Sequence, residues 1–193
     1  MEVLKENVKK LKPKESYCTL MFDEVNLSTE IHYNEALGRI DEFENNGHFT
    51  TQQFADHALL FMVKGITKNF KRPIAYTFVK GATNKHQLCA LIKEVVSSVQ
   101  NTGLEIIATI CDQGATNEGA IRLLHEETKA YYLRKNDQYK DDFYEIIYGP
   151  SELKKRIKII HLFDPPHLLK GIRNNLLQKN LLFVTDNVKK EAQ

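Results

Sequence analysis

The chain has 193 residues, of which 42% are apolar and 27% charged, and its 27 Lys or Arg nearly balance its 25 Asp or Glu. This composition excludes a fibrous or wholly disordered protein, and the length favours one compact domain. No uncharged apolar run reaches the roughly 18 residues that a transmembrane helix needs. The N-terminus has basic residues but no apolar stretch behind them, so we expect no secretory signal and a chain that stays inside the cell.

The cysteines indicate neither a disulfide framework nor a zinc site. Cys18, Cys89 and Cys111 are odd in number, widely spaced and never part of a CxxC pair. We therefore predict three buried thiols.

The charge is unevenly distributed along the sequence. Residues 151–193 carry nine Lys or Arg against four Asp or Glu, a net charge of +5, whereas the first 150 residues sum to −3. This basic end is either a surface that faces phosphates or a solvated helix face, and the charge count alone leaves both readings open.

The first half of the chain predicts strands. Residues 17–27, YCTLMFDEVNL, form a β-prone apolar run typical of a central strand. Residues 31–43, 58–63 and 73–79 are predicted as neighbouring antiparallel strands, because polar or turn-rich stretches separate them.

The second half alternates helices with strands. One helix follows Asn84 as its cap and should cover one side of the sheet with the apolar face Leu88, Leu91, Ile92, Val95, Val96 and Val99. Residues 104–112, LEIIATICD, predict a strand buried on both faces. A second helix follows and runs to about Lys135. After it we predict a polar loop over 136–150, a strand over 157–163 and a last helix that begins after the two prolines of DPPH.

This order predicts an α/β fold with a mixed sheet, in which antiparallel strands lead into parallel strands joined by right-handed helical crossovers. That is the ribonuclease H-like layout, flanked by helices. We expect a helical lead-in over residues 1–15 and the core over residues 16–193. The alternative is an open doubly wound sheet with an irregular N-terminal half.

Two aspartates are the first candidates for chemistry. Asp23 lies inside an apolar strand, where a carboxylate is costly unless it is paired or binds a metal. Taken alone, an Asp near a strand end is more often a structural residue that is hydrogen-bonded to a turn. Asp112 ends the other strongly apolar run, so on neighbouring strands both carboxylates would meet at one edge. Their mutual repulsion favours an oxygen-ligated Mg²⁺ or Mn²⁺ site there.

The segment DPPH supplies a third feature at the end of the last strand. Asp164 can simply cap the following helix, with the prolines in its first turn and His167 facing solvent. Alternatively, His167 and Lys170 support an active site from the polar face of that helix. No Walker A loop, GxGxxG, HExxH or GxSxG motif occurs in the chain.

Four segments together resemble the catalytic core of P element-type transposases, including their domesticated THAP-domain relatives. They are MFDEVNLS (21–28), HALLFMVKGITKNFKRPIAYTF (57–78), ICDQGATNEGAIRLL (110–124) and HLFDPPHLLKGIRNNLL (161–177). The resemblance implies a ribonuclease H-like fold, a DDE-type mechanism with Mg²⁺ or Mn²⁺, DNA as partner and a nuclear location. It matches the first catalytic and metal-binding Asp to Asp23 and the second to Asp112, and it assigns supporting roles to Asp164 and His167. Lys170 and Arg173 are the candidates for contacts to DNA phosphates.

The chain also departs from that family pattern. In the family a GTP-binding insertion follows the DPPH helix and the last acid, a Glu, lies beyond it, so GTP is expected only where that insertion is present. The sequence ends at Gln193, and the zinc finger with its Cys and His ligands is absent. Glu118 is the only local substitute that we expect for the missing Glu, because Glu24 alternates to the other face of its strand.

Two functions therefore stand beside each other. The first is part of a DNA transposase catalytic domain for metal-dependent phosphodiester cleavage and strand transfer, which we expect to be inactive as this fragment. The second is a non-catalytic remnant or domesticated module that binds DNA or protein. The sequence leaves the oligomeric state open, a homo-oligomer included.

Overall fold

The computed structural model describes residues 1–27, 33–35, 39–40, 43–45, 50–81, 83–185 and 188–192. Within these ranges, no helix has both the length and the apolar character to span a membrane.

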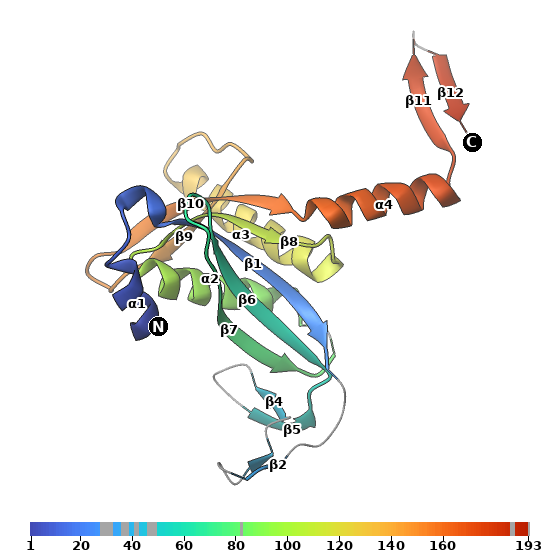
Figure 1. The fold of residues 1–193 in the computed structure, drawn as a ribbon. Coiled ribbons are helices and arrows are strands. Elements are labelled where there is room, and N and C mark those ends of the chain that lie inside the picture. Colours follow the sequence, from blue (N-terminus) through green and yellow to red (C-terminus); the bar gives the residue numbers. More distant parts are fainter. Residues whose placement is uncertain are drawn as a thin grey trace.

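A mixed sheet of eight strands forms the centre of the molecule (Figure 1). Its order is β5-β4-β7-β6-β1-β8-β10-β9, and only the pairs β1–β8 and β8–β10 are parallel. The bounds are β1 Tyr17–Asn26, β4 Phe43–Asn45, β5 Thr50–Phe54, β6 His57–Gly65, β7 Lys71–Val79, β8 Glu105–Cys111, β9 Tyr144–Tyr148 and β10 Lys155–Phe163. The predicted antiparallel strands that lead into parallel strands are thus confirmed.

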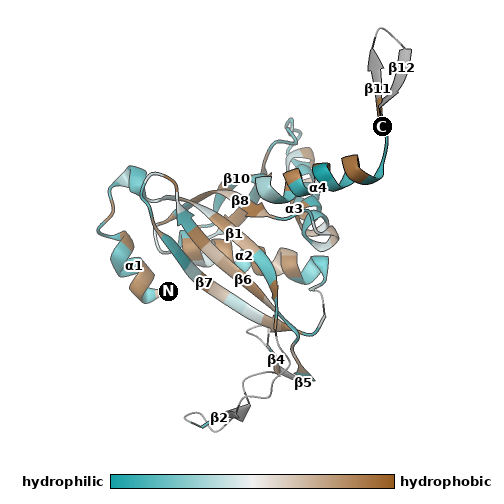
Figure 2. Ribbon diagram, turned by 45° about the vertical axis from the view of Figure 1, so that its right-hand side comes forward, coloured by the Kyte–Doolittle hydropathy of each residue, from teal (hydrophilic) through white to brown (hydrophobic). Residues whose placement is uncertain are grey.

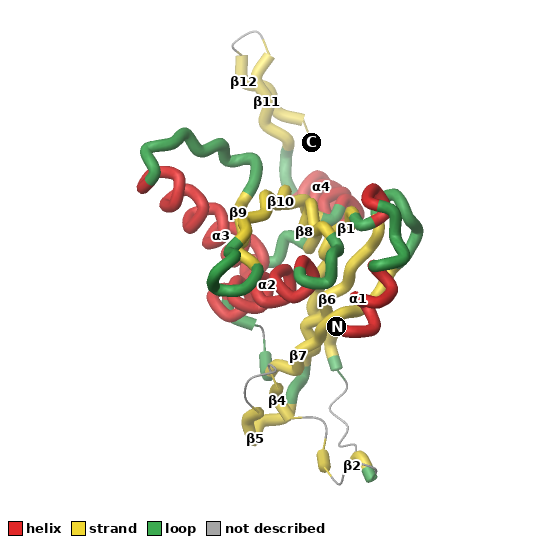
Figure 3. The backbone as a smooth tube through the Cα atoms, turned by 90° about the vertical axis from the view of Figure 1, so that its left-hand side faces the viewer, coloured by secondary structure: helices red, strands yellow, loops and turns green. Residues whose placement is uncertain are grey.

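Two long helices cover one face of this sheet. They are α2 (Lys85–Gln100) and α3 (Ala115–Arg134), which contact each other side by side (Figure 3). Asn84 caps α2 as predicted, since its side chain accepts hydrogen bonds from the backbone N–H groups of His86 and Gln87. The apolar face predicted for α2 is buried in the core.

The remaining helices lie at the two ends of the chain. The predicted lead-in contains α1 (Glu2–Val8) and a 3₁₀ turn, η1 (Pro13–Glu15). Helix α4 (Pro165–Gln178) leaves the body of the molecule after β10 and has no buried residue (Figure 1).

The core lies between the sheet and the pair α2–α3. The inward residues of β1, Cys18, Leu20 and Phe22, are at most 2% exposed and pack with Leu59, Phe61 and Val63 of β6. Figure 2 shows apolar residues along these central strands. All three cysteines are free and buried, as predicted. Burial raises the pKa of the Cys18 and Cys111 thiols to about 12, so both remain protonated at neutral pH.

A register shift interrupts the parallel pairing of β1 with β8. Cys18 lies opposite Ile106, but Thr19 lies opposite Ala108, so Ile107 is an extra residue and is 40% exposed. Such a bulge reverses which residues of the strand face the core. After it, Thr109 and Cys111 point inward beside Leu20 and Phe22.

Strand predictions from the sequence were wrong or missing in three places. Residues 31–43 do not form one neighbouring strand: where they are described, β2 (Tyr33–Asn34) pairs with β3 (Arg39–Ile40) in a separate sheet, and the rest falls largely outside the described residues. The polar loop over 136–150 contains β9, whose pairing with β10 buries Tyr144 and Ile146. The last residues form an unpredicted hairpin of β11 (Leu181–Thr185) and β12 (Val188–Ala192).

The strand over 104–112 is also not buried on both faces. Ile160 and Leu162 of the neighbouring β10 are 53% and 50% exposed, and Tyr76 of β7 is 66% exposed. No described helix covers this second face, which we call the open face, so the apolar run of β8 reflects one buried face only.

A buried polar chain lies under the carboxyl ends of β8 and β10. The hydroxyl oxygen of Thr109 is 2.8 Å from the Tyr144 hydroxyl and 3.1 Å from Nδ1 of His161, whose Nε2 is 3.7 Å from Sγ of Cys111. Burial lowers the pKa of His161 to about 4, so the imidazole is neutral at physiological pH.

We predict that this buried imidazole makes folding sensitive to acid. The unfolded chain protonates His161 near its ordinary pKa of 6.5, whereas the folded chain resists protonation until about pH 4. Stability should therefore fall as pH decreases from about 6.5 to 4, by about 3 kcal/mol in total. Urea unfolding over this range should show a flatter pH dependence for His161→Asn, while His86→Asn, at an exposed position, should keep the wild-type slope. An unchanged slope in His161→Asn would contradict the assignment.

Candidate active site

Three aspartates lie at the same height on three adjacent strands, β1, β8 and β10, or directly after them. Asp23 lies two residues beyond the Met21–Ile110 pair of β1 and β8, and Asp112 lies two residues beyond that pair on the other strand. On β10, Phe163 lies opposite Cys111, so Asp164 is the next residue beside Asp112. The prediction that Asp23 and Asp112 belong to adjacent strands is confirmed.

All three carboxylates line one pocket on the open face. Its volume is about 300 Å³, and His167 contributes to the same wall. Lys71 is the one Lys or Arg among the described residues that line the pocket. The other lining residues are apolar: Met21, Phe22, Val25, Leu60, Met62, Ile110 and Cys111. The pocket thus combines carboxylates with a largely apolar floor.

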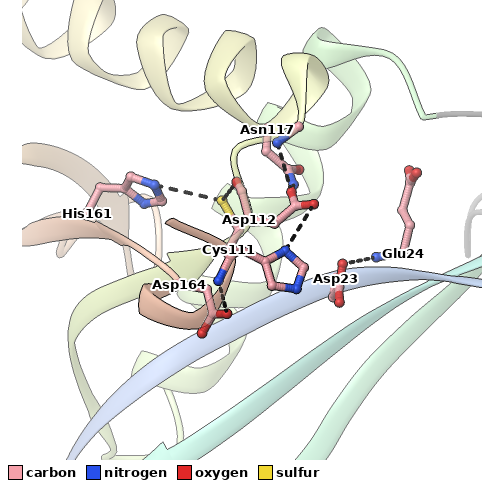
Figure 4. A network of polar contacts seen from close by, with 9 residues as sticks. Asp23, Glu24, Cys111, Asp112, Asn117, His161 and Asp164 are labelled. Carbon is pink, nitrogen blue, oxygen red and sulfur yellow. Dashed lines mark hydrogen bonds and ion pairs between the residues drawn. The ribbon is translucent and has the colours of Figure 1, made fainter. Parts of the chain in front are cut away.

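The two oxygens of Asp112 have different environments (Figure 4). Oδ1 accepts hydrogen bonds from the Gly114 N–H at 2.9 Å and from the Asn117 side-chain amide at 2.6 Å. Oδ2 lies 3.8 Å from Nδ1 of His167 and accepts no hydrogen bond from the described residues. The loop after β8 therefore fixes the carboxylate through one oxygen and leaves the other free for a ligand.

Asp23 has a similar arrangement, since its Oδ1 accepts the Glu24 N–H at 2.9 Å. Partial burial, and after it repulsion from the Asp112 carboxylate, raises the pKa of Asp23 above its ordinary value, although the Glu24 N–H opposes this shift. The expectation that Asp23 is a charge enclosed by an apolar strand is wrong. Its side chain lies on the open face and is only partly buried, because β1 buries the alternate side chains.

The DPPH segment caps α4 as predicted, and two of its residues also line the pocket. Asp164 is the N-cap of α4, and its Oδ2 accepts the His167 N–H at 3.4 Å, with both prolines in the first turn. The Asp164 N–H donates to the Cys111 carbonyl at 2.8 Å, which ties the start of α4 to the end of β8. The capping geometry is therefore what brings the Asp164 and His167 side chains to the pocket.

The other predicted residues lie outside this pocket. Lys170 and Arg173 are exposed further along α4, where the Arg173 guanidinium donates to the side-chain oxygen of Asn174. Glu24 accepts the Thr83 N–H at 3.1 Å, so it belongs to the opposite side of β1 as predicted. Glu118 is in the first turn of α3 but does not line the pocket. Asp164, rather than Glu118, is thus the third acid beside Asp23 and Asp112.

Sequence reasoning missed Asn117 and Lys71. Asn117 follows Asp112 by five residues in the first turn of α3, a position from which a short amide can reach back to the preceding loop. Lys71 begins β7, two strands away from β1, and only the sheet order brings it to the pocket.

Within the described part of the chain, no group of three or more His, Cys, Asp or Glu has the arrangement of a metal site. The carboxylates of Asp23 and Asp112 offer one free oxygen each. The described residues of the pocket therefore supply some of the ligands that a metal ion needs, but not a complete coordination sphere.

Comparison with known proteins defines the class of this fold and site. The model of the TNP-like, RNase H N-terminal domain matches residues 1–125. The chain belongs to this family, and its mixed sheet with α2 and α3 on one face is the ribonuclease H-like fold.

Two known transposases are similar to this chain. The transposable element P transposase of Drosophila melanogaster is 22% identical over 165 residues, which cover 85% of this chain and 18% of that protein. The solved Drosophila P element transposase strand transfer complex matches with a TM-score of 0.65 and 18% identity, over 98% of this chain and 36% of that chain. The resemblance to P element-type transposases is confirmed, and the chain spans about one fifth of the length of the curated relative.

Proposed function

We propose that this chain forms part of a DNA transposase catalytic domain, which in the complete enzyme cleaves phosphodiester bonds and transfers strands. The observation that carries the proposal is the row of Asp23, Asp112 and Asp164 across three adjacent strands of a ribonuclease H-like sheet. The solved relative is described as a strand transfer complex, which supports DNA as the partner. The same assignment implies a nuclear location.

The donor set fits a hard divalent cation. Mg²⁺ and Mn²⁺ prefer carboxylate oxygens, and the neighbouring strands supply them from Asp23 and Asp112. When bound, such ions activate the attacking water or hydroxyl and stabilise the leaving oxygen of an in-line displacement. The chain's own contribution is to hold the two carboxylates at one level and to fix Asp112 through Gly114 and Asn117.

His167 adds an imidazole to the same wall, with its Nδ1 3.8 Å from Oδ2 of Asp112. Its place at the start of α4 lets it support the carboxylate orientation or contact a phosphate oxygen. The proposed DNA contacts of Lys170 and Arg173 lie beyond it on exposed turns of α4, where they would bind backbone phosphates without reading sequence.

The alternative is a domesticated or remnant module that binds DNA or protein without catalysis. The absence of a three-ligand metal group from the described residues favours it for this polypeptide. Metal binding and cleavage separate the two functions.

We predict weak Mn²⁺ binding that requires both Asp23 and Asp112. Each replacement, Asp23→Asn or Asp112→Asn, removes one of two charged ligands and should abolish the binding that calorimetry detects. Unchanged binding in Asp112→Asn would remove the metal role of this pocket.

We predict that Asn117→Ala weakens Mn²⁺ binding by about 10-fold or more, because groups that orient a metal ligand typically contribute 10- to 100-fold to affinity. Asn101→Ala, at the exposed end of α2, is the matched control and should bind as the wild type does. Equal affinities for both variants, with thermal unfolding showing both folded, would exclude an orienting role.

We predict that the 193-residue polypeptide does not nick supercoiled plasmid in Mn²⁺. Two-ion phosphoryl transfer depends on ions held at fixed spacing, and the described ligands form only a partial set. Divalent-dependent nicking that disappears in Asp23→Ala would overturn this expectation. In that case Asp164→Asn would test whether Asp164 supplies the third carboxylate.

A further inference from the structure

A second basic surface lies at the end of the sheet where β1 begins. Residues 1–15 carry five Lys against three Glu, and residues 64–72 carry four Lys or Arg and no acid. These two segments together have a net charge of +6, although the whole chain has only +2. The sequence analysis assigned DNA contacts to the opposite end of the chain, so this surface is a separate feature.

The fold joins the two segments, which are far apart in sequence. The Thr67 hydroxyl donates to the Lys14 carbonyl at 2.6 Å, and the Ile66 N–H donates to the Tyr17 carbonyl at 3.0 Å. The Lys68 ammonium lies 3.7 Å from the Glu15 carboxylate. The turn between β6 and β7 is therefore fixed against η1 and the start of β1, and the positive charges of both segments add in one place.

A pocket of about 300 Å³ lies between α1 and this turn. Its polar lining consists of Lys10, Lys68, Arg72 and Asn7, and no acid lines it. Its apolar part comes from Leu4, Val8, Leu11, Phe70 and Leu104. Lys10 and Arg72 have no carboxylate partner in the part of the chain that the structure describes, so two of the three cations are uncompensated.

The same strand connects this pocket with the carboxylate pocket. Arg72 lines the basic pocket, while the adjacent Lys71 lines the pocket of Asp23 and Asp112. Neighbouring residues of a strand point to opposite faces, so β7 presents one cation to each side. An extended polyanion that passes the start of β7 would meet cations at both pockets, whereas a small anion would use only one.

We propose that the surface of Lys10, Lys68 and Arg72, which we call the α1 surface, binds the phosphate backbone of duplex DNA. The identity of the polyanion rests on the proposed function. Uncompensated cations at an apolar, partly enclosed pocket bind phosphate oxygens through charge and counterion release, without sequence preference. Lys12, Lys14 and Lys64, close by in the same two segments, extend the positive field beyond the pocket.

The test compares DNA affinity as a function of salt for the 193-residue chain and three variants, with a short mixed-sequence duplex as the probe. Lys10→Gln/Lys68→Gln/Arg72→Gln removes three phosphate contacts. When salt rises from about 50 to 200 mM, the wild type should therefore lose about 40-fold more affinity for the duplex than this variant loses. Lys129→Gln/Arg134→Gln/Lys140→Gln removes the same charge from exposed positions elsewhere and should keep most of the wild-type salt dependence.

Lys10→Arg/Lys68→Arg/Arg72→Lys keeps the charges and should bind as the wild type does, and thermal unfolding of all variants verifies that they are folded. Equal salt dependence in the two neutralised variants would overturn the α1 surface while leaving the proposed function intact. A wild-type chain that binds no duplex would overturn both. Tighter binding to vesicles of anionic phospholipid than to the duplex, lost in the neutralised variant, would reassign the surface to a membrane.

Discussion

The parallel pairing of β1 with β8, and the single extra residue within it, determines the geometry of the site. Before the bulge Cys18 lies opposite Ile106, and if that register continued Asp112 would lie beside Glu24, on the covered face. The bulge at Ile107 advances the register by one residue and places Asp112 beside Asp23, on the open face. The carboxylate pair thus depends on one irregular residue in the central strand.

The order of most elements was predictable because they carry a clear local signal. The helix after Asn84 has an apolar period and a cap, and the helix after DPPH has two prolines where a first turn tolerates them. β9 was missed because YEIIY is short and follows a long polar stretch; its strand state depends on pairing with β10 and on burial of Tyr144. The bulge has no local sequence signal either, since Ile107 is one apolar residue among several.

The site was predictable only in part for the same reason. Strand ends supplied Asp23 and Asp112, and the capping signal supplied Asp164 and His167, all of which line one pocket. Lys71 and Asn117 were not predictable from one sequence, because their roles come from sheet order and from a side-chain contact across a loop. Glu118 was expected as the local acid because Glu24 alternates to the other face of its strand, but Glu118, in the first turn of α3, does not line the pocket.

The charge distribution resolves a conflict within the proposed function. A row of carboxylates repels a phosphodiester, and outside residues 1–15, 64–72 and 151–193 the chain has 9 Lys or Arg against 18 Asp or Glu. The cations of residues 1–15 and 64–72 lie beside the start of β1, as do Lys155 and Arg156 at the start of the parallel strand β10. Lys170 and Arg173 lie at the opposite end of the sheet, on α4 beyond Asp164. A duplex held at both ends by cations would be drawn across the acidic region by attraction that does not depend on the carboxylates. Binding and chemistry are thereby assigned to different residues, so the affinity for DNA need not be lost when the metal ligands are changed.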